Sequence, residues 1–182
     1  MTDLSPQSAS NMRQNRQRNV TVIQGEVEIS NDPDVILSTI LGSCVAVCIW
    51  DPVVRVGGMN HFLLSQGSGQ NDVKYGAFAM EMLINGLLRK GAQRSALQSK
   101  IFGGANLLGF GRNIGEKNAA FARKFLADEG IPCLGESLEG DQPRRVRFNP
   151  TTGKVQMLFV KPADVAPEKL VVKQKAADIT LF

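Results

Sequence analysis

The sequence predicts an α+β domain with a largely antiparallel sheet. Short apolar or alternating runs of strand length outnumber the two amphipathic helical segments. Strands and helices do not alternate regularly along the chain, which argues against a parallel βαβ sheet. The 182 residues, 43% of them hydrophobic, suffice for one sizeable core. We expect one domain over residues 20–161, a flexible N-terminal tail over 1–19, and a C-terminal tail or docking arm over 162–182.

The N-terminal half favours short strands. Residues 1–19 are polar and rich in Ser, Gln, Asn and Arg, which is typical of a flexible tail. Residues 20–29 predict one or two strands, and a turn follows them. A short β-branched run, residues 35–41, stops at Gly42-Ser43. The next two runs, residues 44–50 and 59–64, predict an antiparallel pair; the first is apolar on both parities, as a buried strand is.

The second half adds the helices and the remaining strands. Asp72 can cap a helix whose apolar residues recur at spacings of three and four and which ends near Lys90-Gly91. Asn113 can cap a second helix, ending at Glu129-Gly130. Strands are expected at residues 99–102, 131–134, 145–148 and 155–160, the last two forming a hairpin.

Composition and charge exclude several classes of function. The net charge of +4 is a weak basic bias and not the clustered Lys/Arg face of a nucleic-acid-binding protein. Three cysteines without a secretory signal favour free thiols in a reducing compartment. No apolar run approaches the length of a membrane span. We therefore expect a cytoplasmic protein that neither inserts into a membrane nor binds nucleic acid.

Cys44 and His61 are the candidate catalytic pair. Each alone is more often a core residue, but together a thiol and the chain's only histidine are the minimum parts of a cysteine hydrolase. Gly42 permits an unusual backbone angle before the cysteine, and the backbone N–H groups around Ser43 and Cys44 could form an oxyanion hole. A third group must orient the imidazole, and the nearby hydroxyls belong to Ser38, Thr39 and Ser43.

No cofactor or metal is expected. One histidine and three scattered cysteines do not give the spacing of a four-ligand zinc site. The glycine-rich pieces at 103–104 and 109–111 lack the Gly-Lys-Ser/Thr of a phosphate loop.

Six motifs, in order between about residues 20 and 160, closely resemble those of the CheD family of chemotaxis proteins. They are Leu41-Gly42-Ser43-Cys44-Val45-Ala46-Val47, Gly57-Gly58-Met59-Asn60-His61, Lys74-Tyr75, Gly103-Gly104-Ala105, the run Asn113 to Asn118, and the run Arg145 to Gly153. The resemblance implies a chemoreceptor glutamine deamidase. It also implies a fold like that of the cytotoxic necrotizing factor toxins, with antiparallel sheets packed together and flanked by helices.

The resemblance also implies a catalytic set of Cys, His and Thr. Cys44 and His61 match the first two. The family's threonine lies six residues before the cysteine, which is Ser38 in this chain; serine keeps the hydroxyl. Thr39 is the alternative, and its side chain would face the other side of the strand.

The implied substrate is the cytoplasmic helical bundle of a chemoreceptor, deamidated during chemotactic adaptation, and the CheC phosphatase is a possible partner. Two alternatives stay open. One is a non-catalytic adaptor that binds a chemotaxis phosphatase or receptor. The other is a different cysteine hydrolase acting on small substrates.

Overall fold

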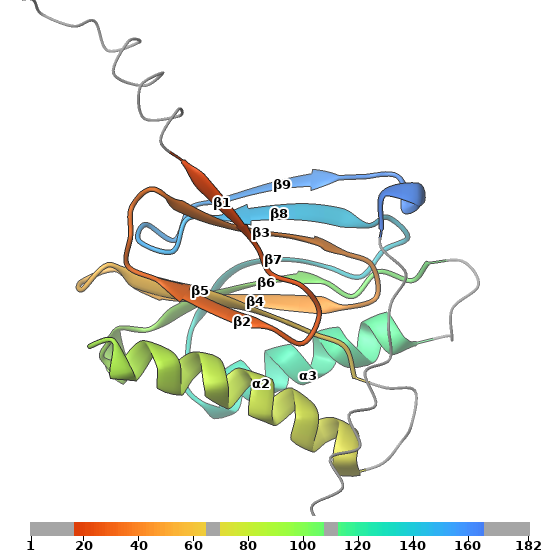
Figure 1. Cartoon of the computed structure of the whole chain (residues 1–182). Helices are drawn as coiled ribbons and strands as arrows, with labels where there is room; N and C mark the ends of the chain where they lie inside the picture. The colour runs from red at the N-terminus through yellow and green to blue at the C-terminus, as the bar shows by residue number, and fades with distance from the viewer. Residues whose placement is uncertain (1–16, 65–69, 108–112, 166–182) are drawn as a thin grey trace, which may run out of the picture.

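Two β-sheets stack face to face, and both long helices cover the outer face of the larger sheet (Figure 1). The computed structural model describes residues 17–64, 70–107 and 113–165. The smaller sheet has the order β1 (Arg18–Thr21), β3 (Val35–Leu41), β8 (Arg144–Phe148) and β9 (Val155–Phe159). The larger has the order β2 (Val27–Ser30), β5 (Val56–Phe62), β4 (Val45–Asp51), β6 (Gln98–Gly103) and β7 (Cys133–Leu138).

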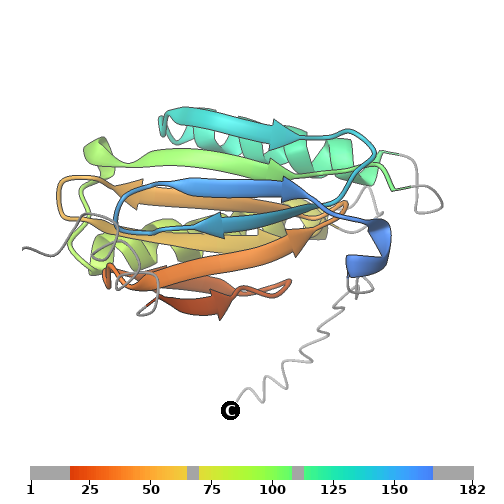
Figure 2. The same cartoon turned by 90° about the horizontal axis from the view of Figure 1, so that it is seen from above.

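Seen from above, the smaller sheet lies over the larger one (Figure 2). The helices are α2 (Gln70–Arg89) and α3 (Ile114–Asp128), with short 3₁₀ turns η1 (Arg94–Ala96) and η2 (Pro162–Asp164). Only β1–β3 and β6–β7 pair in parallel; the other pairings in the described chain are antiparallel. The α+β class with largely antiparallel sheets is therefore confirmed.

Strand β4 lies between two hydrophobic cores, which explains why its sequence is apolar on both faces. Side chains alternate between the two faces of a strand. Val45, Val47 and Ile49 lie in the core between the larger sheet and the helices. Cys44 and Cys48 belong to the second core, between the two sheets. The prediction of a buried strand here is confirmed, and the alternation places Cys44 on the face that meets the smaller sheet.

Strand β3 supplies the opposing wall. Leu37 and Leu41 lie in the core between the sheets, and Thr39 is buried between them in sequence. Ser38 belongs to the other face of the same strand and is only partly buried. The strand thus sends alternate side chains toward the second core.

Some predicted boundaries shift. Helix α2 already includes Gln70, so Asp72 lies inside its first turn and the predicted start is wrong. Asn113 does precede α3, but in a left-handed conformation and without a capping bond from its side chain. Arg18 belongs to β1, while residues 1–16 and 166–182 lie outside the described residues. The tails therefore remain predictions. No helix in the described part of the chain is long and apolar enough to cross a bilayer.

Candidate active site

Cys44 and His61 lie at the same end of the β4–β5 pair, as the antiparallel arrangement predicts. His61 is paired with Ala46, two residues after Cys44. Residues two apart share a strand face, so the thiol and the imidazole extend from diagonal positions on the face that meets the smaller sheet. Both residues are buried, Cys44 with 3% of its surface exposed and His61 with 6%.

The His61 ring is held by two oxygens at Nδ1. The Thr39 Oγ1 atom lies 3.0 Å from Nδ1, and the Val22 carbonyl oxygen lies 3.1 Å from it. A carbonyl oxygen only accepts, so Nδ1 carries the proton that it donates to Val22. The neutral ring then has its lone pair on Nε2, which is the protonation state a general base needs.

The Val22 carbonyl is itself fixed by backbone bonds. The Val22 N–H donates to the Ser38 carbonyl over 2.8 Å. Further along the same segment, the Gly25 N–H donates to the His61 carbonyl over 2.7 Å and the His61 N–H to the Glu26 carbonyl over 3.1 Å. The segment that precedes β2 therefore positions His61 through its backbone.

The structure corrects the prediction that Ser38 contacts the imidazole. The Ser38 hydroxyl lies 3.5 Å from the Val20 carbonyl oxygen, on the side of β3 away from His61. The hydroxyl that reaches His61 belongs to Thr39. The physical reason is the strand period of two, because a shift of one residue turns a side chain to the opposite face.

The Gly42-Ser43-Cys44 turn is fixed through its carbonyl oxygens. The Gly42 and Cys44 carbonyls accept N–H bonds of 2.8 Å each from Ala105 and Gly104. The Ser43 carbonyl accepts a 3.0 Å bond from the buried Asn118 side chain. The N–H of a trans peptide points opposite to its C=O. The N–H groups of Ser43 and Cys44 therefore point away from Ala105 and Asn118, whose N–H groups bind the Gly42 and Ser43 carbonyl oxygens.

Asn118 is a site residue to which sequence analysis gave no role. Its side chain on α3 accepts the Leu64 N–H over 2.8 Å and donates to the Ser43 carbonyl. It therefore connects the chain just after β5 to the cysteine turn. The sequence did contain a signal for Asn118, because this residue ends the 113–118 motif that resembles the CheD family.

Gly103 allows the end of β6 to approach the cysteine closely. A Cβ at this position would lie 2.1 Å from the Cys44 carbonyl oxygen, and its φ of 115° belongs to the region that favours glycine. Close packing of the backbone therefore explains the Gly103-Gly104 pair, which the sequence did not match to a phosphate loop.

Two further side chains lie at the thiol. The Cys44 Sγ–H points to the Gln24 carboxamide oxygen, 3.6 Å away. A Cβ added at Gly25 would lie 3.2 Å from the Tyr75 hydroxyl on α2. Burial first, and the charge of Cys44 second, raise the pKa of Tyr75. Gln24 carried no sequence signal, whereas Tyr75 belongs to a matched motif.

The other cysteines differ from Cys44. Burial raises the pKa of Cys48 strongly, which keeps this thiol protonated in the core. Cys133 is exposed at the start of β7.

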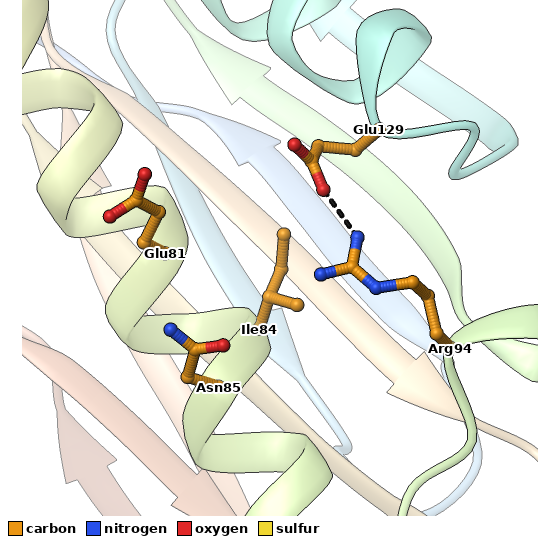
Figure 3. Close-up of a pocket in the computed structure, with 5 residues that line it drawn as sticks. All are labelled: Glu81, Ile84, Asn85, Arg94 and Glu129. Carbon is orange, nitrogen blue, oxygen red and sulfur yellow. Dashed lines mark hydrogen bonds and ion pairs between the residues drawn. The ribbon is translucent and has the colours of Figure 1, made fainter.

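A hollow on the surface lies elsewhere. It is formed where α2 faces η1 and the end of α3, and the Arg94–Glu129 ion pair spans part of it (Figure 3). Its remaining lining residues, Glu81, Ile84 and Asn85, all lie on α2. None of the residues around Cys44 contributes to it.

Comparison with known proteins identifies the family. The family model for CheD, described as chemotactic sensory transduction, matches residues 63–158. A protein of Rhizobium meliloti is 55% identical over 144 residues, 76% of this chain and 79% of its own length. One of Caulobacter is 50% identical over 155 residues, 83% of this chain and 82% of its own. Both are named "Probable chemoreceptor glutamine deamidase CheD".

Similar solved structures are more distant. A Neisseria meningitidis protein has a TM-score of 0.45 at 11% identity, over 85% of this chain and 81% of its own. The Bacillus licheniformis protein YfiH has a TM-score of 0.41 at 17% identity, over 64% of this chain and 50% of its own. The assignment depends on the family model and on the extent of identity to the named relatives. The chain belongs to the CheD family.

Proposed function

We propose that this chain is a chemoreceptor glutamine deamidase. It converts glutamine side chains in the cytoplasmic helical bundle of a receptor to glutamate, releases ammonia, and acts in the cytoplasm during chemotactic adaptation. The observation that carries the proposal is the His61 ring, held at Nδ1 by Thr39 and Val22 on the sheet face that also bears Cys44.

Cys44 is the nucleophile in this mechanism. His61 Nε2 takes the thiol proton, and the thiolate attacks the carboxamide carbon of the substrate. The backbone N–H groups of Ser43 and Cys44 stabilise the oxyanion, because the carbonyl contacts of this turn fix its peptide planes. The protonated His61 then gives its proton to the leaving nitrogen, and ammonia departs as the thioester forms.

Hydrolysis of the thioester completes the cycle. His61 takes a proton from water, and the resulting hydroxide attacks the thioester carbon. The C–S bond breaks, the substrate side chain is released as a carboxylate, and the thiolate recovers a proton. Each turnover thus adds one negative charge to the receptor helix, which biases its signalling state.

Gln24 supports a carboxamide substrate. Its own carboxamide oxygen accepts the Cys44 thiol over 3.6 Å, so the surroundings of the sulfur accommodate the functional group that the reaction requires. Because Cys44 is 3% exposed and Gln24 contacts its sulfur, we expect the substrate side chain to displace Gln24 as it binds.

Ammonia release from a receptor cytoplasmic fragment tests the proposal. The wild-type chain should release ammonia, and Cys44→Ala and His61→Ala should not, while Cys48→Ala serves as a matched control on the same strand. Circular dichroism should show that all four proteins are folded. Full activity in either Cys44→Ala or His61→Ala would falsify the catalytic pair.

The burial of Cys44 also suits the second candidate, a non-catalytic adaptor that binds the receptor or the CheC phosphatase. Thiol labelling separates the two, because an activated cysteine reacts quickly near neutral pH and a core cysteine does not. The labelling is best done in a Cys133→Ser background, since Cys133 is exposed and would react by itself. Fast, His61-dependent labelling of Cys44 favours the enzyme, and slow labelling favours the adaptor.

A further inference from the structure

Helix α2 carries an exposed apolar stripe that begins beside the candidate active site. We propose that this stripe, made of Tyr75, Phe78 and Met82, is the surface on which one helix of the protein substrate docks. The inference rests on the proposed function, because it names the contact that holds the substrate of that function.

The stripe is a coherent face of the helix. Its members are spaced by three and four residues, which places them on one side of an α-helix. Tyr75 is 37% exposed, Phe78 58% and Met82 44%. The buried face of α2, with Met80, Leu83 and Leu87, packs on the larger sheet instead. From Tyr75 to Met82 the stripe is about 10 Å long, which is two helical turns.

Tyr75 connects the stripe to the thiol. Its hydroxyl lies close to Gly25, the residue after Gln24, and the Gln24 side chain contacts Cys44. Ile23, exposed by 58%, precedes Gln24 in the segment that contacts Cys44. Ile23 and Tyr75 are therefore exposed next to the Gln24 and Gly25 positions of the segment that contacts the sulfur. We expect a protein whose glutamine reaches Cys44 to contact them.

The shape and chemistry of the stripe fit a helix. A ridge of side chains at spacings of three and four packs into the grooves of another helix. Aromatic residues and methionine are enriched in protein interfaces, and methionine adapts to varied partners. Arg89 lies on the same side of α2, one further heptad beyond Met82, and can pair with acidic side chains of the helix that docks.

The described chain offers a control surface of similar character. Leu158 on β9 is 67% exposed, but β9 is an edge strand of the smaller sheet, whereas α2 covers the outer face of the larger sheet. Leu158→Glu therefore introduces the same charge into an exposed apolar position that the proposal does not involve.

Steady-state kinetics on a folded receptor cytoplasmic fragment test the docking. Phe78→Glu and Met82→Glu should each raise KM by about tenfold or more, as loss of an interface hot spot does, with kcat nearly unchanged. Phe78→Leu should keep most of the affinity, and Leu158→Glu should match the wild type. When Phe78→Glu or Met82→Glu is combined with Cys44→Ala, the receptor fragment should bind more weakly than to Cys44→Ala alone, by the same factor. Labelling of Cys44 by a small reagent should proceed at the wild-type rate in every variant that retains the thiol.

The outcomes separate this inference from the proposed function. A wild-type chain that converts no receptor glutamine removes the function itself. An active wild type with an unchanged KM in Phe78→Glu and Met82→Glu overturns only the docking surface. A lower KM in Phe78→Glu would mean that a segment of this chain covers the stripe. If the wild type is a dimer and Phe78→Glu is a monomer, the stripe is covered by a second copy of the chain. Either result overturns the proposal.

Discussion

Thr39→Val removes one hydroxyl from the buried contact with His61 and leaves the shape of the side chain nearly intact. The Thr39 Oγ1 atom lies 3.0 Å from Nδ1, so the variant removes this contact and keeps the one to the Val22 carbonyl oxygen. The imidazole should keep its tautomer but lose part of its orientation. Ser38→Ala, on the adjacent residue, is the matched control because its hydroxyl contacts Val20.

The size of the effect follows from the charge that His61 carries during the reaction. A hydrogen bond to a charged group contributes about 1.5–3 kcal/mol. Since about 1.4 kcal/mol corresponds to a factor of ten in rate, Thr39→Val should lower kcat by about 10- to 150-fold. KM should stay within about twofold, because Thr39 acts through His61 and not on the substrate. Thr39→Ser keeps a hydroxyl and should recover most of the rate.

Ammonia release by Thr39→Val, Thr39→Ser and Ser38→Ala provides the assay. A full rate in Thr39→Val together with a slow Ser38→Ala would refute the assignment of the orienting role to Thr39.

Three other changes test the scaffold. Gly103→Ala should lower the melting temperature by clearly more than Gly91→Ala, since both glycines have positive φ but only Gly103 would meet backbone, at 2.1 Å; equal shifts would mean that the clash is relieved. Asn118→Leu leaves the buried Leu64 N–H and Ser43 carbonyl without their hydrogen-bond partner. Urea denaturation should show that the free energy of unfolding falls by about 2–6 kcal/mol, against little change for the exposed Asn106→Leu. A loss below about 1 kcal/mol would contradict the role of Asn118. Burial raises the pKa of Asp51, but N–H bonds from Gln93, Val53 and Val54 outweigh burial, and the net pKa is lowered. The carboxylate therefore stabilises the fold above about pH 4 and loses this effect as the pH falls through the lowered pKa. The deficit of Asp51→Asn in unfolding free energy should be largest at neutral pH and shrink on acidification; a constant deficit would contradict a charge effect.

The sequence predicts the large features of the fold because they depend on local patterns. The run 44–50 is apolar on both parities because strand β4 is covered by helices on one side and by the smaller sheet on the other. The turn between Asp51 and Val56 brings β4 and β5 together, which places Cys44 and His61 at one end. Their proximity followed from strand pairing alone.

The remaining parts of the site depend on contacts that are distant in sequence. A hydroxyl six residues before the cysteine matched the family spacing, but the pleat of β3 turns Ser38 away from the imidazole and Thr39 toward it. Asn118 reaches Ser43 across 75 residues, and Gln24 reaches Cys44 across 20. No periodicity encodes such contacts, so only the three-dimensional structure shows them.

Mass spectrometry of a receptor cytoplasmic fragment tests the central claim most directly. After incubation with the wild-type chain, peptides of the fragment should show conversion of specific glutamines to glutamate. Cys44→Ala, at the same concentration, should leave the same peptides unconverted, and Cys48→Ala should convert them as the wild type does. Equal conversion by Cys44→Ala, or a folded wild type with a reactive Cys44 that converts no receptor glutamine, would contradict the account.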